Sequence, residues 1–202
     1  MEPNRWHKLM KAFNLANNVS TYDSLLKVYS EKHRHYHTFQ HIDACLSHLD
    51  KSKNFAQNSQ EIEVALWFHD AIYKPYSPNN ELKSAIWAKK FLLENKIDKT
   101  IADRVYDLIM VTLHNCPTTT IDEVLLVDID LTILGSQPEV YQVFENNIRK
   151  EYRWIPYFYY RKKRKEILQF FLTHARIYQT EYFYNLLEKQ ARENIQRTLM
   201  DL

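Results

Sequence analysis

Glycine is almost missing from this chain, since Gly135 is the one glycine among 202 residues. Tight hairpins, glycine-rich phosphate loops and doubly wound nucleotide folds all use glycine for backbone angles that other residues avoid. This scarcity argues against those three architectures. It favours a chain built mainly from helices.

Cysteine and long apolar runs are scarce as well. Cys45 and Cys116 form no C-x-x-C motif and are too few for a disulfide framework. The N-terminal segment MEPNRWHKLM has no signal-peptide core, and no apolar run approaches the roughly 20 residues needed to cross a bilayer. We therefore expect a soluble protein of a reducing, cytoplasmic setting, without a membrane partner.

Neither sign of charge is in large excess, because 27 Lys and Arg stand against 25 Asp and Glu, a formal net charge of +2. One local run, RKKRK at 161–165, is strongly basic. Its flanks, YFYY and EILQFFL, carry an aromatic and aliphatic stripe of the kind that a helix buries, and we expect the tyrosine-rich segment 157–184 to join the core. The run then becomes a solvated helix face, which argues against nucleic acid as a partner.

Apolar residues recur at helical spacing through most of the chain, and no internal repeat is evident. Candidate helix starts are Thr38, Asn79, Thr120 with Glu123 three residues later, and Ser136 before Pro138, while Gly135 is a natural stop. The pattern predicts an all-α fold with helices at 4–17, 20–33, 39–53, 60–73, 80–95, 99–114, 121–134, 138–153, 157–174 and 178–200.

Histidine is plentiful where the other special residues are rare. Four of the nine histidines fall within residues 33–41, and His37 and His41 both lie in YHTFQHIDACL, where His41 begins an apolar stripe beside Cys45. In EIEVALWFHDAIY, His69 continues the apolar stripe of its helix and Asp70 follows directly. Burying an imidazole with a carboxylate is costly unless they are paired or coordinate a cation, so this doublet favours a metal.

Two further carboxylates lie in an apolar segment, LLVDIDLTILG, as Asp128 and Asp130. Imidazoles and carboxylates from separate helices would make a mixed nitrogen and oxygen site suited to Mn, Fe, Co, Ni or Zn, with positions left open for water. Whether the site holds one metal ion or two depends on whether Asp128, His114 or Glu81 reaches the same pocket. His114 and Glu81 have ordinary alternatives, as a histidine at a helix C-terminus and a glutamate in a first helical turn.

These residues resemble the HD superfamily of metal-dependent phosphohydrolases, whose pattern is a histidine, a distant His-Asp doublet and a later aspartate. Here the matching positions are His41, His69 with Asp70, and Asp130. The segment YHTFQHIDACL is similar to the motif Tyr-His-Asn-x-x-His-x-x-Asp-Val of the cyclic nucleotide phosphodiesterases. By that resemblance His41 is a metal ligand and His37 is the histidine that protonates the leaving oxygen.

The chain departs from the phosphodiesterases, because it is much shorter, has Thr38 in place of the asparagine and shows no purine-clamping glutamine. A closer resemblance is to a group of small bacterial proteins described as predicted HD-type phosphohydrolases. They share R-x-YH-T-x-x-HI, WFHDA-x-Y, NE-x-x-SA, D-x-DL-x-ILG and AR-x-N, which match here from Arg34 to about Asn194. The resemblance implies one HD-type helical domain over 1–202, with the metal-site core at about 34–135 and C-terminal helices at 138–200.

The implied activity is hydrolysis of a phosphate ester by a metal-activated water, and a nucleotide is the substrate class that the superfamily favours. Asp70 could orient or deprotonate the water, and His37 could deliver a proton to the leaving oxygen. Arg34 and Lys74 flank the two metal motifs and could hold phosphate oxygens.

Three other interpretations compete with this one. LLVDIDLTIL also fits the first motif of the haloacid dehalogenase phosphatases, but that fold needs strands after the motif, where this chain is helical in pattern. A non-catalytic module could hold a metal and a nucleotide without cleaving it. An iron-dependent oxygenase is a further alternative, because a scaffold does not fix a reaction.

Overall fold

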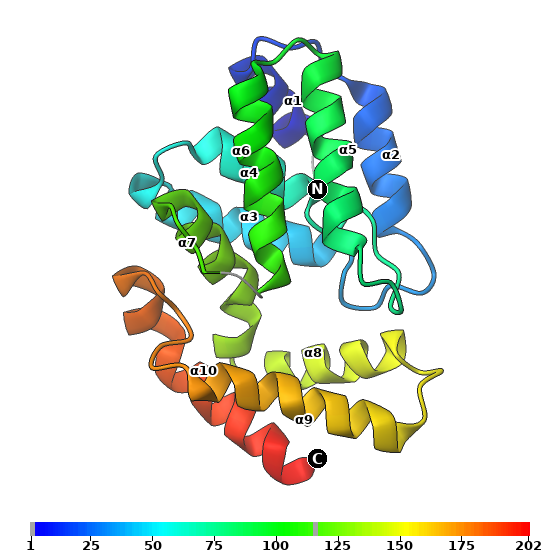
Figure 1. The fold of residues 1–202 in the computed structure, drawn as a ribbon, viewed down its shortest axis with the longest axis vertical. Coiled ribbons are helices and arrows are strands. Elements are labelled where there is room, and N and C mark those ends of the chain that lie inside the picture. Colours follow the sequence, from blue (N-terminus) through cyan, green and yellow to red (C-terminus); the bar gives the residue numbers. More distant parts are fainter. Residues whose placement is uncertain (1–2, 115–116) are drawn as a thin grey trace. The chain divides into compact units, whose positions relative to one another are not determined.

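The computed structural model describes residues 3–114 and 117–202, and Cys116 lies outside the described residues. The described residues form α-helices, short 3-10 helices and connecting turns, and contain no strand (Figure 1). The predicted all-α fold class is therefore confirmed. The absence of strands in the described part after Asp130 also removes the haloacid dehalogenase interpretation, which requires them.

Every predicted helix has a counterpart in the described structure. The helices are α1 (Pro3–Ala12), α2 (Val19–Tyr29), α3 (Phe39–Ser52), α4 (Ser59–Phe68), α5 (Asn80–Glu94), α6 (Lys99–Met110), α7 (Ile121–Asp130), α8 (Pro138–Glu151), α9 (Tyr157–Thr173) and α10 (Glu181–Asp201). Short 3-10 helices follow three of them: η1 (Lys53–Phe55), η2 (Val111–Leu113) and η3 (Leu131–Gly135).

The chain divides into two compact units, Met1–Val127 and Asp128–Leu202. In the first unit α4 packs against α3, α5 and α6 (Figure 1). Its core is aromatic: Trp6 meets the edge of Trp67 with ring centroids 5.3 Å apart, and Phe68 stacks on Phe91. This packing fixes α4, whose C-terminal end carries the His-Asp doublet. The HD-domain type and a single-domain organisation stay predictions.

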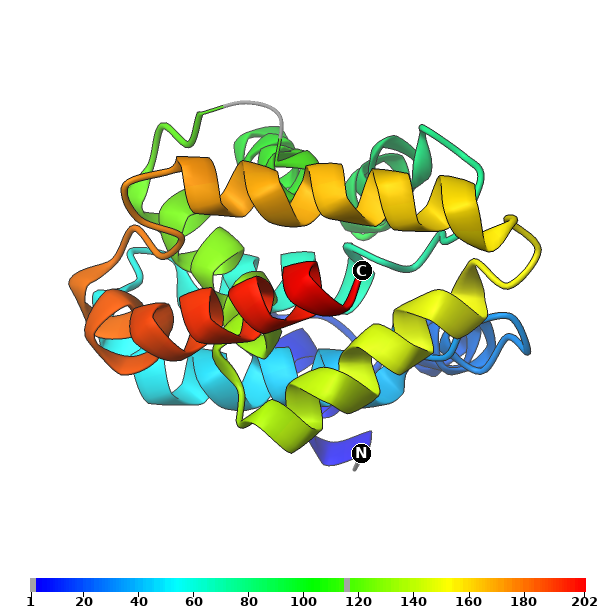
Figure 2. The same ribbon diagram turned by 90° about the horizontal axis from the view of Figure 1, so that it is seen from below.

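In the second unit α10 packs against η3 and α9. Figure 2 shows α8, α9 and α10 as the long helices of this unit. Gly135 is needed here for close approach, because a Cβ at this position would lie 2.6 Å from Leu187 Cβ. The Tyr178 hydroxyl donates to the Leu131 carbonyl at 2.9 Å, which ties the segment before α10 to η3.

Several helices end earlier than the pattern predicts. α4 ends at Phe68 instead of residue 73, so His69 and Asp70 lie in the turn that follows it. Pro75 has no N–H to donate to the Ala71 carbonyl, so a helix could not continue through this segment with its usual bonds. α1 ends at Ala12, and Asn14 then takes a left-handed backbone conformation.

The prediction that the aromatic flank of the basic run is buried was wrong for the first turn of α9. Tyr157, Phe158 and Tyr159 are exposed, and only Tyr160 of that group is buried. The helix turns its buried stripe through Tyr160, Arg164 and Leu168, and the three preceding rings lie outside that stripe. Among the described residues, none of the helices combines the length and apolar character that crossing a membrane requires.

Candidate metal centre

Two short motifs place the histidines of the site. The Thr38 side chain caps α3 by accepting a hydrogen bond from the Gln40 backbone N–H, so His41 lies in the first turn of that helix. His69 follows the last residue of α4, and its backbone N–H donates to the Ala65 carbonyl. Because α3 packs against α4, the two imidazoles meet although they are 28 residues apart in sequence.

The polar atoms of three side chains converge at this point. The Nε2 atoms of His41 and His69 lie 3.2 Å apart, and Asp70 Oδ2 lies 3.2 Å from His69 Nε2 and 3.6 Å from His41 Nε2. Both imidazoles are almost fully buried, and the Asp70 side chain is 17% exposed. Solvent is thus excluded from the two imidazoles and has access to the Asp70 side chain.

The tautomer of His69 follows from its second nitrogen. His69 Nδ1 lies 2.9 Å from the Leu66 carbonyl oxygen, which can only accept, so Nδ1 carries the proton in a neutral ring and Nε2 presents a lone pair to the cluster. A backbone carbonyl that fixes the far nitrogen is the usual support of a metal-binding histidine. Either a proton on His41 Nε2 or a metal ion can satisfy this lone pair, and the mixed set of imidazole nitrogens and carboxylate oxygens fits a metal ion.

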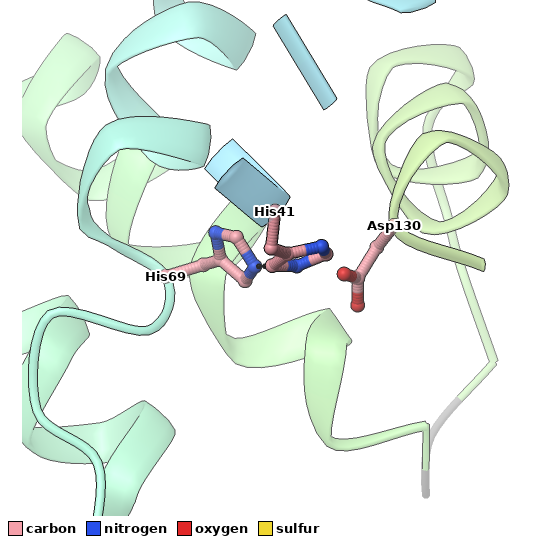
Figure 3. Close-up of side chains that lie close together, drawn as sticks. All are labelled: His41, His69 and Asp130. Atoms are coloured by element: carbon pink, nitrogen blue, oxygen red, sulfur yellow. Dashed lines mark hydrogen bonds between the residues drawn. The ribbon is translucent and has the colours of Figure 1, made fainter. Parts of the chain in front are cut away.

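Asp130 offers a further carboxylate. It is the last residue of α7 (Ile121–Asp130). Single ligand atoms of His41, His69 and Asp130 all lie within 4.8 Å of one another, and Figure 3 shows the carboxylate pointing toward the two imidazoles. These three residues could hold a metal ion, as the sequence predicts.

The electrostatics of Asp70 are dominated by its histidines. Burial alone would raise the pKa of this carboxyl, but His69, His37 and His41, when protonated, bring its pKa well below its ordinary value. The carboxylate is therefore ionised at neutral pH and available to a cation.

His37 lies beside this cluster in a different environment from His41. Its ring stacks on Tyr73, with centroids 4.1 Å apart, and meets the edge of Tyr36 at 5.0 Å. It is half-buried, and its charge acts on both Asp70 and Glu81. The structure thus separates a buried histidine in the cluster from a more accessible one next to it.

Arg34 has a position that the sequence analysis did not anticipate. Its side chain is fully buried, and its guanidinium donates to the backbone carbonyls of His37, Asp70 and Ala71 at 2.7 to 3.2 Å. Its Nε donates to Glu31 as well. The side chain ties the segment that carries His37 to the turn that carries Asp70, so the geometry favours a positioning role over the predicted contact with phosphate.

Glu81 and His114 are electrostatic neighbours of the cluster. Glu81 is half-buried, and burial and the Asp70 charge raise its pKa, whereas His114 and His37 act in the opposite direction. His114 has a left-handed backbone with φ of 53°, an uncommon conformation for a residue with a side chain. Their predicted roles toward a second metal or the substrate stay predictions.

Asp128 and Lys74 have other surroundings. The Asp128 carboxylate accepts from the backbone N–H groups of Gln179 and Thr180 and from the Thr180 hydroxyl, so its burial is explained without a metal. Lys74 is exposed, and its backbone N–H and carbonyl both bond to the Asn80 side chain. These hydrogen bonds do not support the predicted roles of Asp128 as a metal ligand and of Lys74 as a phosphate contact. They do not test those roles either, so both stay predictions.

Sequence reasoning missed two contributors to the site. Tyr73, which stacks on His37, lies in the quoted motif WFHDAIY, but helical periodicity does not indicate a ring in a turn. The Leu66 carbonyl that orients His69 has no signal in residue type at all. Cys45 was placed correctly on the stripe beside His41, and its Sγ lies 3.7 Å from His41 Nδ1.

Comparison with known proteins adds no relative to this picture. No protein-family model, no curated protein and no solved structure matches the chain.

Proposed function

We propose that the protein is a metal-dependent phosphohydrolase that cleaves a phosphate ester, with a nucleotide as its substrate class. The observation that carries the proposal is the convergence of His41 Nε2, His69 Nε2 and the Asp70 carboxylate, of which only the carboxylate is accessible. Such a mixed set with open positions is characteristic of catalytic metal sites, whereas structural zinc sites are closed by four cysteine or histidine ligands.

His41, His69, Asp70 and Asp130 would hold the ion. A divalent ion bound there would lower the pKa of a bound water and screen the charge of the phosphate. Asp70, which reaches the accessible side of the cluster, would orient that water.

His37 donates a proton to the leaving oxygen. Its ring is held by Tyr73 and Tyr36 and lies close enough to Asp70 and Glu81 for their charges to interact. A general acid must present a protonated ring nitrogen to the leaving oxygen, a role that an imidazole can fill near neutral pH. Arg34 holds the segments that carry His37 and Asp70 in place, because its guanidinium donates hydrogen bonds to the backbone carbonyls of both residues.

The experiment is a hydrolysis screen with protein loaded with Mn, Co, Ni, Zn or Fe. Substrates are a nitrophenyl phosphodiester and a panel of nucleoside phosphates, and release of nitrophenol or of phosphate is measured. We expect metal-dependent release by the wild type and none by His41→Ala/His69→Ala. Metal-loaded protein that turns over no member of the panel would contradict the proposal, and turnover that needs both iron and oxygen would assign the oxygenase alternative instead.

A further inference from the structure

The turn between α8 and α9 exposes an unusual number of large rings. Trp154 is 75% exposed, Phe158 73%, Tyr159 65% and Tyr157 53%. We call Lys150 to Lys163 the aromatic–basic turn. Apolar rings on the surface are ordinary when scattered singly, but here four gather within six residues, and Phe158 meets the edge of Tyr159 with centroids 5.7 Å apart. Such a concentration of exposed rings is typical of an interaction site.

The rings are held outward by ordered contacts beneath them. The Arg149 guanidinium donates to the carbonyls of Tyr152 and Ile155, at 2.6 and 3.1 Å, and lies over the Tyr160 ring. A buried pair between Arg164 and Glu145 joins α9 to α8. The turn is therefore a fixed part of the second unit, and its exposed rings are not the product of a frayed helix end.

The charge of the turn is entirely positive at its surface. Residues 146–165 contain eight basic side chains and one acidic side chain, Glu151, which is buried. Five of the basic side chains are exposed: Lys150, Arg153, Arg161, Lys162 and Lys163, of which Lys163 is paired with Glu166 just beyond the turn. Because the whole chain carries a net charge of only +2, this segment concentrates its positive charge.

We propose that the aromatic–basic turn docks the protein onto an anionic membrane surface, with Trp154 and Phe158 entering the headgroup region and the surrounding lysines and arginines facing lipid phosphates and carboxylates. Tryptophan and tyrosine prefer the membrane interface, and a cluster of exposed cations supplies the attraction to anionic lipid. The proposal concerns surface attachment only, which replaces the sequence-based expectation of no membrane partner and needs no membrane-spanning helix. It is independent of the metal centre.

The shape of the site favours a bilayer over a nucleic acid. Figures 1 and 2 show the turn, in yellow, at the end of the α8 and α9 pair, where the chain reverses direction. Single-stranded nucleic acids are bound in basic grooves along which successive bases stack on rings. Exposed rings gathered in one turn between two helices suit insertion into the soft headgroup region of a bilayer.

The test is co-sedimentation of the full chain with vesicles of phosphatidylcholine mixed with phosphatidylserine, compared with vesicles of phosphatidylcholine alone. We expect binding to the anionic vesicles, weak or no binding to the neutral ones, and loss of binding at high salt. Arg161→Glu/Lys162→Glu should weaken binding about fivefold for each cation removed, and more for the reversed charge. Trp154→Ala/Phe158→Ala should weaken it at least tenfold.

Matched variants control for nonspecific effects. Lys90→Glu/Lys189→Glu changes two lysines that are 68% and 92% exposed elsewhere, and Leu186→Ala/Met200→Ala removes exposed apolar side chains from α10. Both should bind like the wild type. A lipid carrying a fluorescence quencher should reduce tryptophan emission more in the wild type than in Trp154→Ala, since Trp6 and Trp67 are fully buried and Trp87 is only partly exposed.

Four outcomes would overturn the proposal. They are absence of vesicle binding, equal binding to neutral vesicles, and binding that survives both changes in the turn. The fourth is a partner other than lipid: either an oligonucleotide that binds through the turn in place of vesicles, or a dimer in solution that Trp154→Ala/Phe158→Ala dissociates.

Discussion

His37 and His41 are four residues apart, yet their surroundings differ. His41 is buried with its Nε2 atom 3.2 Å from that of His69, whereas His37 is half-buried and stacks on Tyr73. The first environment suits a ligand and the second a group that exchanges protons with a substrate. Separate substitutions can therefore separate the two proposed roles.

We predict that His37→Gln keeps the metal and loses turnover by about 100-fold to 10,000-fold, the usual contribution of a general acid. His41→Gln should instead lose metal, because the amide cannot replace the imidazole lone pair. Elemental analysis and turnover rates on the same preparations distinguish the two. Loss of metal from both variants would refute the division of roles.

Arg34 should act on the site without touching the substrate. Arg34→Met leaves three backbone carbonyls without their donors, so we expect a loss in unfolding free energy of about 3 kcal/mol, at roughly 1 kcal/mol or more for each. Metal affinity should fall about tenfold or more, because Asp70 loses its support. Urea unfolding and metal titration measure these effects, with the exposed Arg161→Met as the control. Unchanged metal affinity would limit Arg34 to a role in stability.

The sequence was most informative about the number and position of the helices. All ten predicted helices have a counterpart, because their amphipathic stripes and caps are local properties: Thr38 caps α3, and Thr120 and Glu123 bond reciprocally at the start of α7. Helix ends were less predictable. The end of α4 depends on Pro75 and on Arg34, a distant residue that takes the Asp70 and Ala71 carbonyls.

Sequence could indicate the site residues but not all their partners. Asp128 and Asp130 lie in the same apolar segment, and only the contacts with Gln179 and Thr180 reveal that Asp128 supports the start of α10. The exposed rings of α9 were mispredicted for a similar reason. Their residue type favours burial, but whether a ring is buried depends on which face of the helix packs against the rest of the protein.

Asp128→Asn tests which role this residue has. We expect it to destabilise the protein by about 1 to 3 kcal/mol, because the amide oxygen can accept from only one of the Gln179 and Thr180 N–H groups and the amide nitrogen cannot accept from the other. Metal content should stay at the wild-type value. Loss of metal from a folded Asp128→Asn protein would show that Asp128 is a ligand after all.

Gly135→Ala probes the packing of η3 on α10. The added Cβ would meet Leu187 Cβ at 2.6 Å and the Leu187 carbonyl oxygen at 2.8 Å, so we expect a loss of about 1 to 3 kcal/mol from overpacking. Denaturant unfolding measures it, with Ser136→Ala as a neighbouring control. An unchanged midpoint would mean that α10 can move away from η3 at no cost.

At the scale of the whole molecule, metal binding should be linked to stability. An ion that binds only the folded chain at about 100 times its dissociation constant raises the unfolding free energy by about 2.7 kcal/mol. We expect a higher melting temperature with added metal, and a smaller gain as pH falls, because protons compete for the imidazoles. A metal-induced rise that persists in His41→Ala/His69→Ala would place the ion elsewhere.

The most direct test of the account is the metal content of tag-free protein purified without added metal, measured by elemental analysis beside the His69→Ala/Asp70→Ala variant. The account predicts about one or two equivalents of a transition metal in the wild type and none in a folded variant. Equal content in both, or none in either after reconstitution, would contradict it.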